Sequence, residues 1–373
     1  MELPQIDPST LEREIRAGTA SVVLDVRSEE DFAAWHLDTG SVPLRQRHWQ
    51  QIVDDPAGVA GWQVAGQPIR VICARGISSE KVVRALIDHG IDATSVRGGM
   101  IGWSRLLSHD EVPDVPGVHV EQFRREARGC LSYVVSADGE ALVVDPAPDV
   151  EPYRDFARSK GLTITHVLDT HVHADHLSGL RQLHAASGAA THVSRAAIDR
   201  GFVLDGVEAL VDGDRIAVGS ADVRVISLPG HTSDNIGVMV SGRALIAGDS
   251  LFTDSVARPD LEVGDAGAAG AAGQLYRTVH ERILSLDPAT RLLPCHYPGG
   301  RVDGPIAPTL REVSETVGLR GLSEAQFVEQ SITAMPPRPA NYLEILAVNL
   351  GSETSGDVAG LEIGANNCAV ASE

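Results

Sequence analysis

The feature that most constrains the fold is a series of short apolar runs that lead directly into histidine or aspartate. Four such runs, THVLDT, VRVISL, RALIAGD and TRLLPCH, are typical of buried strands. Helical stretches such as HLSGLRQLHAA and GQLYRTVHERIL lie between them, which indicates a layered α/β domain. Side chains that follow strand ends meet at one edge of such a fold. The polar residues placed in this way are His171, His173, Asp175, His176, His231, Asp249 and His296.

This set of residues predicts a metal site. A single histidine in a protein is more often a hydrogen-bonded core residue than a ligand. Five histidines and two aspartates at strand ends, four of them within six residues, are poorly explained in that way. Imidazole and carboxylate ligands suit zinc, iron or manganese. The chain is therefore expected to be a metal-dependent enzyme.

The first part of the chain predicts a separate small α/β domain. The runs SVVLDV (21–26) and IRVICA (69–74) are interpreted as buried strands, and residues 78–90 carry one apolar helical face. We expect Ser78 or Ser79 to cap the start of this helix and Gly90 to cap its end.

The acidic, proline-containing segment SHDEVPDVPG (108–117) predicts a linker. This divides the chain into domains at 1–110 and 118–350, with an irregular tail at 351–373. In the second domain, LSYVVSA and ALVVDPA are expected to form a strand pair that turns at Asp138-Gly139.

Composition excludes several classes of protein. A net charge of −20 leaves no positive footprint for nucleic acid. No apolar run approaches the length of about 20 residues that spans a membrane, and the N-terminus lacks the pattern of a secretory signal. The four cysteines are scattered, which favours a reducing cytoplasm over a disulfide scaffold. We expect a cytoplasmic enzyme with small-molecule partners and with homo-oligomerisation left open.

The motifs THVHADHLSG, PGHT, AGDSLF and the late CH resemble those of the metallo-β-lactamase superfamily over residues 118–300. The resemblance implies an αβ/βα sandwich. It also implies two adjacent metal positions that Asp249 is able to bridge. The implied ligands are His171, His173 and His231 in one position and Asp175, His176 and His296 in the other.

Within that superfamily the chain is most similar to persulfide dioxygenases and their glyoxalase II relatives, through HADH, PGHTSDN, ARPDL and PPRPANYLEILAVNLG. The dioxygenase resemblance implies one Fe(II) held by His171, His231 and Asp249, with open positions for a thiol persulfide and dioxygen. Sulfite and the carrier thiol would be the products. The glyoxalase II alternative implies two zinc ions that activate water against a thioester. In either branch Arg258 and Tyr297 are expected to contact the thiol carrier.

Cys73 is the predicted nucleophile of the first domain. It ends the run IRVICA, and the loop and helix that follow offer backbone N–H groups that stabilise an anionic thiolate. With DVRSEEDF and GGMIGW, the loop resembles that of a rhodanese-like domain over residues 5–107, which implies that Cys73 carries sulfur. Cys130 and Cys295 are interpreted as buried structural thiols. The combined hypothesis is a persulfide dioxygenase coupled to a sulfurtransferase. A non-catalytic sulfur carrier or sensor is a third, weaker hypothesis.

The acidic surface predicts that salt stabilises the protein. Only Lys81 and Lys160 are lysine, and carboxylate repulsion at low ionic strength is screened by added ions. We expect the melting temperature to rise between dilute buffer and molar KCl. If calorimetry shows a flat or falling melting temperature, the scarcity of lysine is better explained by a GC-rich genome that encodes arginine in its place.

Overall fold

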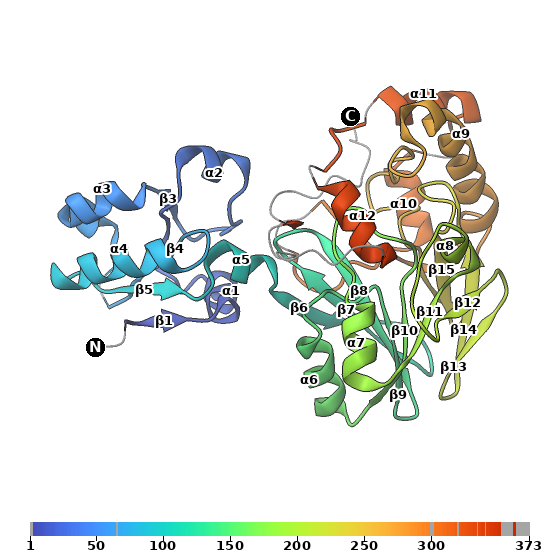
Figure 1. The fold of residues 1–373 in the computed structure, drawn as a ribbon, viewed down its shortest axis with the longest axis horizontal. Helices are drawn as coiled ribbons and strands as arrows, with labels where there is room; N and C mark the ends of the chain where they lie inside the picture. The colour runs from blue at the N-terminus through green and yellow to red at the C-terminus, as the bar shows by residue number, and fades with distance from the viewer. Residues whose placement is uncertain are drawn as a thin grey trace. The chain divides into compact units, whose positions relative to one another are not determined.

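The computed structural model describes residues 3–64, 66–298, 302–318, 321–333, 335–339, 341–351 and 361–362. The chain forms two compact units (Figure 1). The first contains Met1–Leu106 with the short segment Arg125–Arg128, and the second begins at Leu107 and contains most of the remainder. The irregular tail predicted from residue 351 lies almost entirely outside the described residues, as does Cys368.

The first unit is built on a parallel sheet with the strand order β1-β5-β4-β2-β3. Its strands are β1 (Gln5–Ile6), β2 (Val23–Asp25), β3 (Leu44–Gln46), β4 (Ile69–Ile72) and β5 (Ala93–Val96). Its helices are α1 (Pro8–Ala17), α2 (Glu29–Ala34), α3 (Trp49–Asp54), the 3-10 helix η1 (Pro56–Trp62), α4 (Ile77–Asp88) and α5 (Gly99–Ser104).

Both faces of this sheet are covered, because consecutive strand residues point to opposite sides. Leu24 packs with Val82 and Leu86 of α4, whereas its neighbour Val23 packs with Leu11 of α1 and Met100 of α5. The near-continuous apolar runs of the sequence are therefore those of a doubly covered parallel sheet.

The second unit contains two sheets. The larger has the order β12-β11-β10-β9-β8-β7-β6. Its strands are β6 (Leu107–Glu111), β7 (His119–Arg125), β8 (Cys130–Ala137), β9 (Glu140–Val144), β10 (Thr163–Leu168), β11 (Ala190–Ser194) and β12 (Glu208–Leu210). The smaller has the order β13-β14-β15-β16-β17. Its strands are β13 (Arg215–Val218), β14 (Ala221–Ser227), β15 (Ile236–Val240), β16 (Ala244–Ile246) and β17 (Arg291–Leu293).

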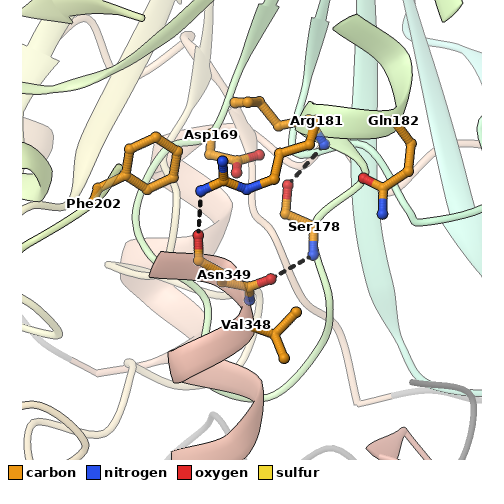
Figure 2. Close-up of a pocket in the computed structure, with 8 residues that line it drawn as sticks. Asp169, Ser178, Arg181, Gln182, Phe202, Val348 and Asn349 are labelled. Carbon is orange, nitrogen blue, oxygen red and sulfur yellow. Dashed lines mark hydrogen bonds between the residues drawn. The ribbon is translucent and has the colours of Figure 1, made fainter. Parts of the chain in front are cut away.

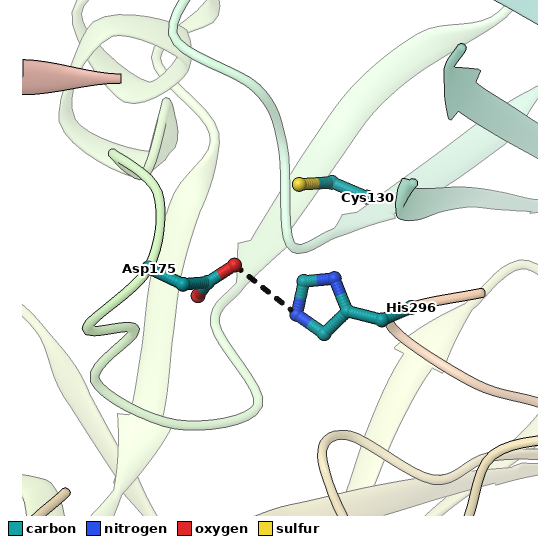
Figure 3. A group of neighbouring side chains, drawn as sticks. All are labelled: Cys130, Asp175 and His296. Carbon is teal, nitrogen blue, oxygen red and sulfur yellow. Dashed lines mark ion pairs between the residues drawn. The ribbon is translucent and has the colours of Figure 1, made fainter. Parts of the chain in front are cut away.

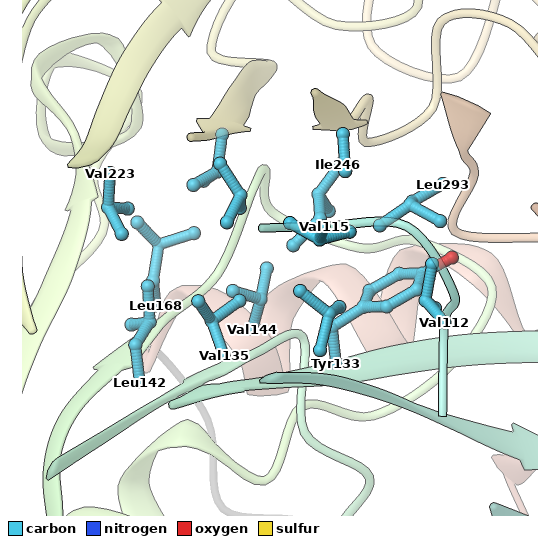
Figure 4. Packing of buried hydrophobic residues seen from close by; sticks show 14 of the residues in the cluster. Val112, Val115, Tyr133, Val135, Leu142, Val144, Leu168, Val223, Ile246 and Leu293 are labelled. Atoms are coloured by element: carbon cyan, nitrogen blue, oxygen red, sulfur yellow. The ribbon is translucent and has the colours of Figure 1, made fainter. Parts of the chain in front are cut away.

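The two sheets face each other across one apolar core. Figure 4 shows Tyr133, Leu142 and Leu168 of the larger sheet packed against Val223 and Ile246 of the smaller one. Two further apolar clusters cover the outer faces of the sheets. The first cluster, on the larger sheet, includes residues of α6 (Glu151–Lys160), α7 (Leu180–Ser187), α8 (Arg195–Asp199) and α12 (Tyr342–Leu350). The second cluster, on the smaller sheet, includes residues of α9 (Gly264–Arg277), the π-helix η2 (Thr278–Ile283), α10 (Leu310–Thr316) and α11 (Glu324–Thr333). The result is the predicted αβ/βα sandwich.

The hairpin predicted at Asp138-Gly139 is confirmed. Strands β8 and β9 pair in antiparallel fashion with Ala137 opposite Glu140, which leaves a two-residue turn. Both turn residues have positive φ, 49° and 84°, as the favoured two-residue hairpin turns require.

Two local predictions are corrected. Residues 108–111, predicted as linker, form most of β6, an edge strand that has no buried residue and therefore no apolar alternation. Helix α4 begins at Ile77 after Gly76, so neither Ser78 nor Ser79 caps it. Its end is as expected, because His89 is the C-cap and Gly90 follows it in the left-handed conformation with a φ of 75°. The Ser79 hydroxyl bonds instead to the carbonyl oxygen of Gly76 inside the first turn.

Among the residues that the structure describes, none of the helices combines the length and apolarity needed to cross a membrane.

Candidate metal centre

Strand direction brings the predicted ligands to one edge of the sandwich. HVHADH lies in the loop between the end of β10 at Leu168 and the start of α7 at Leu180. His231, Asp249 and His296 follow the ends of β14, β16 and β17. These three strands run in the same direction, since β16 and β17 are parallel and β15 is antiparallel to both β14 and β16.

His171, His231 and Asp249 form one buried group, and each is at most 2% exposed. The Asp249 Oδ2 atom lies 3.9 Å from His171 Nε2 and 3.6 Å from His231 Nε2. Both distances exceed those of a hydrogen bond. Ligand atoms about 2.1 Å from a tetrahedral metal would lie about 3.4 Å apart. The spacing therefore fits a shared cation better than direct contact.

The hydrogen bonds of the two imidazoles leave Nε2 available as a ligand atom. His231 Nδ1 donates to the carbonyl oxygen of Arg258 at 2.7 Å, and a carbonyl only accepts. His171 Nδ1 donates to Thr170 Oγ1 at 3.0 Å, because the hydroxyl proton is given to the carboxylate of Asp145 at 2.9 Å. Both Nε2 atoms thus keep their lone pairs, as metal-binding histidines require.

Burial and ligand availability agree with cation binding at this group. Burial lowers the pKa of His171 well below its usual range, and the neighbouring His173 adds to the effect, so the imidazole is neutral. Among the described residues, His171 Nε2 and both carboxylate oxygens of Asp249 have no hydrogen-bond partner. Buried polar atoms without partners are costly, and a cation removes that cost. The residues present therefore fit a bound metal ion.

The remaining four predicted ligands lie directly beside this group. His173 Nε2 is 3.1 Å from Asp145 Oδ1, which leaves Nδ1 as its available ligand atom. His176 Nδ1 is 3.0 Å from Asp175 Oδ1. His296 Nε2 lies 3.4 Å from an oxygen of Asp175 and 3.4 Å from Asp249 Oδ1. Asp249 therefore faces His171 and His231 through Oδ2 and His296 through Oδ1.

Cys130 belongs to the same cluster, which the sequence interpretation missed. Its sulfur groups with ligand atoms of Asp175 and His296 at the start of β8 (Figure 3). Burial raises the pKa of this thiol, but His176 and His296 outweigh it and lower the pKa to about 5. The sequence carried no signal for this placement beyond a cysteine at the start of a strand.

Asn349 is a second residue that the sequence interpretation missed. Its amide nitrogen donates to the backbone oxygens of His173 and His176 at 2.8 Å each. Its amide oxygen accepts from the backbone nitrogen of Ser178 at 3.0 Å (Figure 2). Glu362 accepts from the next backbone nitrogen, that of Leu177, at 2.9 Å. Residues near the C-terminus therefore hold the HVHADH loop in shape.

The two predicted substrate-binding side chains face the protein interior. The Arg258 guanidinium is 1% exposed and is bound by Asp260 at 2.7 Å and by the Pro337 carbonyl at 3.1 Å. Tyr297 is buried in the core between the sheets. Arg258 contributes to the centre through its backbone oxygen, which orients His231, and not through its charge.

Cys73 lies in the first unit, before the N-terminus of α4. Its sulfur accepts from the backbone nitrogen of Gly76 at 3.1 Å and lies 3.3 Å from Ser79 Oγ. Gly99 passes so close that an added Cβ would lie 2.1 Å from the Cys73 carbonyl oxygen, so the loop requires glycine there. The loop and the backbone N–H group expected beside Cys73 are therefore present, and the role of Cys73 as a nucleophile stays a prediction.

Comparison with known proteins identifies both units. The sequence model of the metallo-beta-lactamase superfamily matches residues 125–296, and that of the rhodanese-like domain matches residues 7–106. A hydroxyacylglutathione hydrolase of Rhodospirillum rubrum is 34% identical over 188 residues, which cover 50% of this chain and 68% of the relative. A probable metallo-hydrolase of Burkholderia pseudomallei is 32% identical over 252 residues, covering 56% of this chain and 83% of the relative.

Two solved structures share the fold of the second unit. A metallo-beta-lactamase from Staphylococcus aureus superposes with a TM-score of 0.58 at 26% identity, covering 64% of this chain and 74% of that structure. ETHE1 from Myxococcus xanthus superposes with a TM-score of 0.56 at 26% identity, covering 63% and 99% respectively.

The hydrogen bonds of Asp145 predict that Asp145→Asn weakens metal binding. Its Oδ2 accepts from Thr170 at 2.9 Å and from Cys295 at 2.8 Å, so an amide NH₂ there would face two donors. Thr170 would turn and lose its orientation toward His171. We expect metal affinity to fall about 10–100-fold in competition with a chelator.

Asp149→Asn is the matched control, because Asp149 is an exposed residue of the same loop. Unchanged affinity in Asp145→Asn would show that the Thr170 hydroxyl does not orient the ligand.

Proposed function

The chain belongs to the metallo-beta-lactamase superfamily, and we propose that it oxidises a low-molecular-weight thiol persulfide to sulfite at one Fe(II) held by His171, His231 and Asp249. The observation that carries the proposal is the group of two imidazole nitrogens and one carboxylate, with ligand atoms within 4.8 Å of one another. Two histidines and one carboxylate with open positions are the ligand set of non-haem Fe(II) oxygenases. The similarity to ETHE1 fits the persulfide dioxygenase branch.

Fe(II) in this group would supply the redox chemistry that lets dioxygen react with a persulfide sulfur. The protein contributes rigid, neutral imidazoles. The Arg258 carbonyl fixes the tautomer of His231. The hydrogen bond from the Thr170 hydroxyl to the Asp145 carboxylate fixes the tautomer of His171. Burial of all three ligands limits access of bulk water to the reacting sulfur.

The rhodanese-like domain supports the same substrate class. A thiolate at Cys73 that takes the outer sulfur of a persulfide releases the carrier as a thiol and becomes a persulfide itself. The Gly76 N–H group, which points at the Cys73 sulfur, would stabilise the thiolate that attacks the persulfide. The two domains of one chain would therefore both handle persulfide sulfur.

A thioester hydrolase with two zinc ions is the alternative, and a specific observation favours it. Asp249 Oδ1 lies 3.4 Å from His296 Nε2 while Oδ2 faces His171 and His231, which is the placement of a bridging carboxylate. The similarity to a hydroxyacylglutathione hydrolase also fits this alternative. In that reaction, zinc ions held by these residues would supply the Lewis acidity that activates water against a thioester.

Metal content and oxygen uptake distinguish the two reactions. We expect protein purified without oxygen to hold about one iron per chain and to consume oxygen when a thiol persulfide is added. His171→Ala and His231→Ala should lose iron and oxygen uptake together, because each removes an iron ligand. His176→Ala and His296→Ala should keep iron, with activity reduced about 10–100-fold.

Two zinc ions per chain, thioester hydrolysis and no oxygen uptake would contradict the dioxygenase. In that case His176→Ala and His296→Ala should each release one of the two metals.

Cys73→Ser tests whether the two activities are independent. Because Cys73 and the metal centre lie in separate compact units, the variant should lose sulfur transfer from thiosulfate or a persulfide to a thiol. Oxygen uptake with a preformed thiol persulfide should be largely kept. Loss of both activities in a folded Cys73→Ser protein would show that the two sites are not independent.

A further inference from the structure

The backbone sets Cys130 directly beside His296. The two residues form an isolated antiparallel bridge. The flanking hydrogen bonds run from Leu131 N to the Cys295 oxygen at 2.7 Å and from Tyr297 N to the Gly129 oxygen at 3.0 Å. This pattern makes 130 and 296 a non-hydrogen-bonded pair, in which the side chains share one face and approach most closely.

Asp175 completes a compact group with these two residues. Ligand atoms of Cys130, Asp175 and His296 all lie within 4.8 Å of one another, and each residue is at most 4% exposed (Figure 3). Asp175 Oδ2 lies 3.4 Å from His296 Nε2, the spacing of two ligands of one ion.

The adjoining carboxylate independently indicates a cation at this position. Asp249 Oδ1 is buried, has no hydrogen-bond partner among the described residues, and faces His296 Nε2 at 3.4 Å. A buried carboxylate oxygen in such a place needs a positive neighbour.

We propose that Cys130, Asp175 and His296 form a second metal position that takes a thiophilic divalent cation such as zinc through a sulfur ligand. The inference goes beyond the proposed function, because it concerns neither the iron ligands nor the oxidation of persulfide. Cys130 comes from β8 and lies outside every histidine and aspartate motif of the sequence.

Donor chemistry separates the two positions. The first offers two nitrogens and one oxygen, which suit Fe(II). The second offers one sulfur, one nitrogen and one oxygen, and thiolate donors select zinc and other soft or borderline ions. Iron in the first position and zinc in the second would therefore be held by one chain, with Asp249 between them.

Cobalt(II) is the probe that reports a sulfur ligand directly. When the metal-free full chain is titrated with up to two equivalents of Co²⁺, we expect a near-ultraviolet sulfur-to-cobalt charge-transfer band. The band should be absent in Cys130→Ser, while cobalt bound to nitrogen and oxygen ligands remains visible. Cys295→Ser is the matched control. It removes a buried thiol one residue from His296 that bonds to Asp145, and it should keep the band.

X-ray absorption at the zinc edge tests the wild-type protein without any variant. In iron-loaded protein given one equivalent of zinc, we expect one sulfur neighbour at about 2.3 Å from zinc and no loss of iron. Zinc with only nitrogen and oxygen neighbours, or a cobalt band that persists in Cys130→Ser, would overturn the proposal. Neither readout involves oxygen uptake, so failure here leaves the dioxygenase standing, and failure of the dioxygenase leaves this site standing.

Discussion

The second unit is organised around the burial of one carboxylate. Asp249 is fully buried, and neither of its oxygens has a hydrogen-bond donor among the described residues. A charge in that position is tolerated only if a cation or charged partner compensates it. The sandwich meets this requirement by ending β10, β14, β16 and β17 around the same point, so that imidazoles arrive from both sheets.

Orientation of the ligands depends on a further layer of buried polar groups. Asp145 lies at the end of β9 and accepts from both Thr170 and His173, so one carboxylate sets the hydrogen bonds of two successive histidines. Burial raises the pKa of Asp145, but the charge of His173 and hydrogen bonds from its neighbours, including Cys295, outweigh burial and lower it. In the first unit, the backbone N–H group of Gly76 and the hydroxyl of Ser79 contact the Cys73 sulfur.

The sequence predicted what depends on local pattern. β-Branched runs identified the strands that carry the ligands, and Asp138-Gly139 identified the hairpin, because both signals lie within a few residues of the structure they produce. Residue type and strand ends were enough to group all seven candidate ligands. Strand β6 was missed because none of its residues is buried, so its sequence carries no apolar alternation.

What escaped prediction depends on contacts between distant segments. Cys130 meets His296 through an isolated antiparallel bridge between distant segments, and Asn349 reaches His173 across 176 residues. The substrate contact expected of Arg258 stays a prediction, and its guanidinium is buried against Asp260, two residues away.

The hold of Asn349 on the HVHADH loop has a consequence for the order of events during synthesis. The ribosome delivers the loop first, and its clamp only after another 176 residues have been added. Until then the backbone oxygens of His173 and His176 lack the hydrogen bonds that the Asn349 amide donates to them. A nascent chain that has not yet reached α12 therefore lacks the side chain that fixes the backbone of the HVHADH loop.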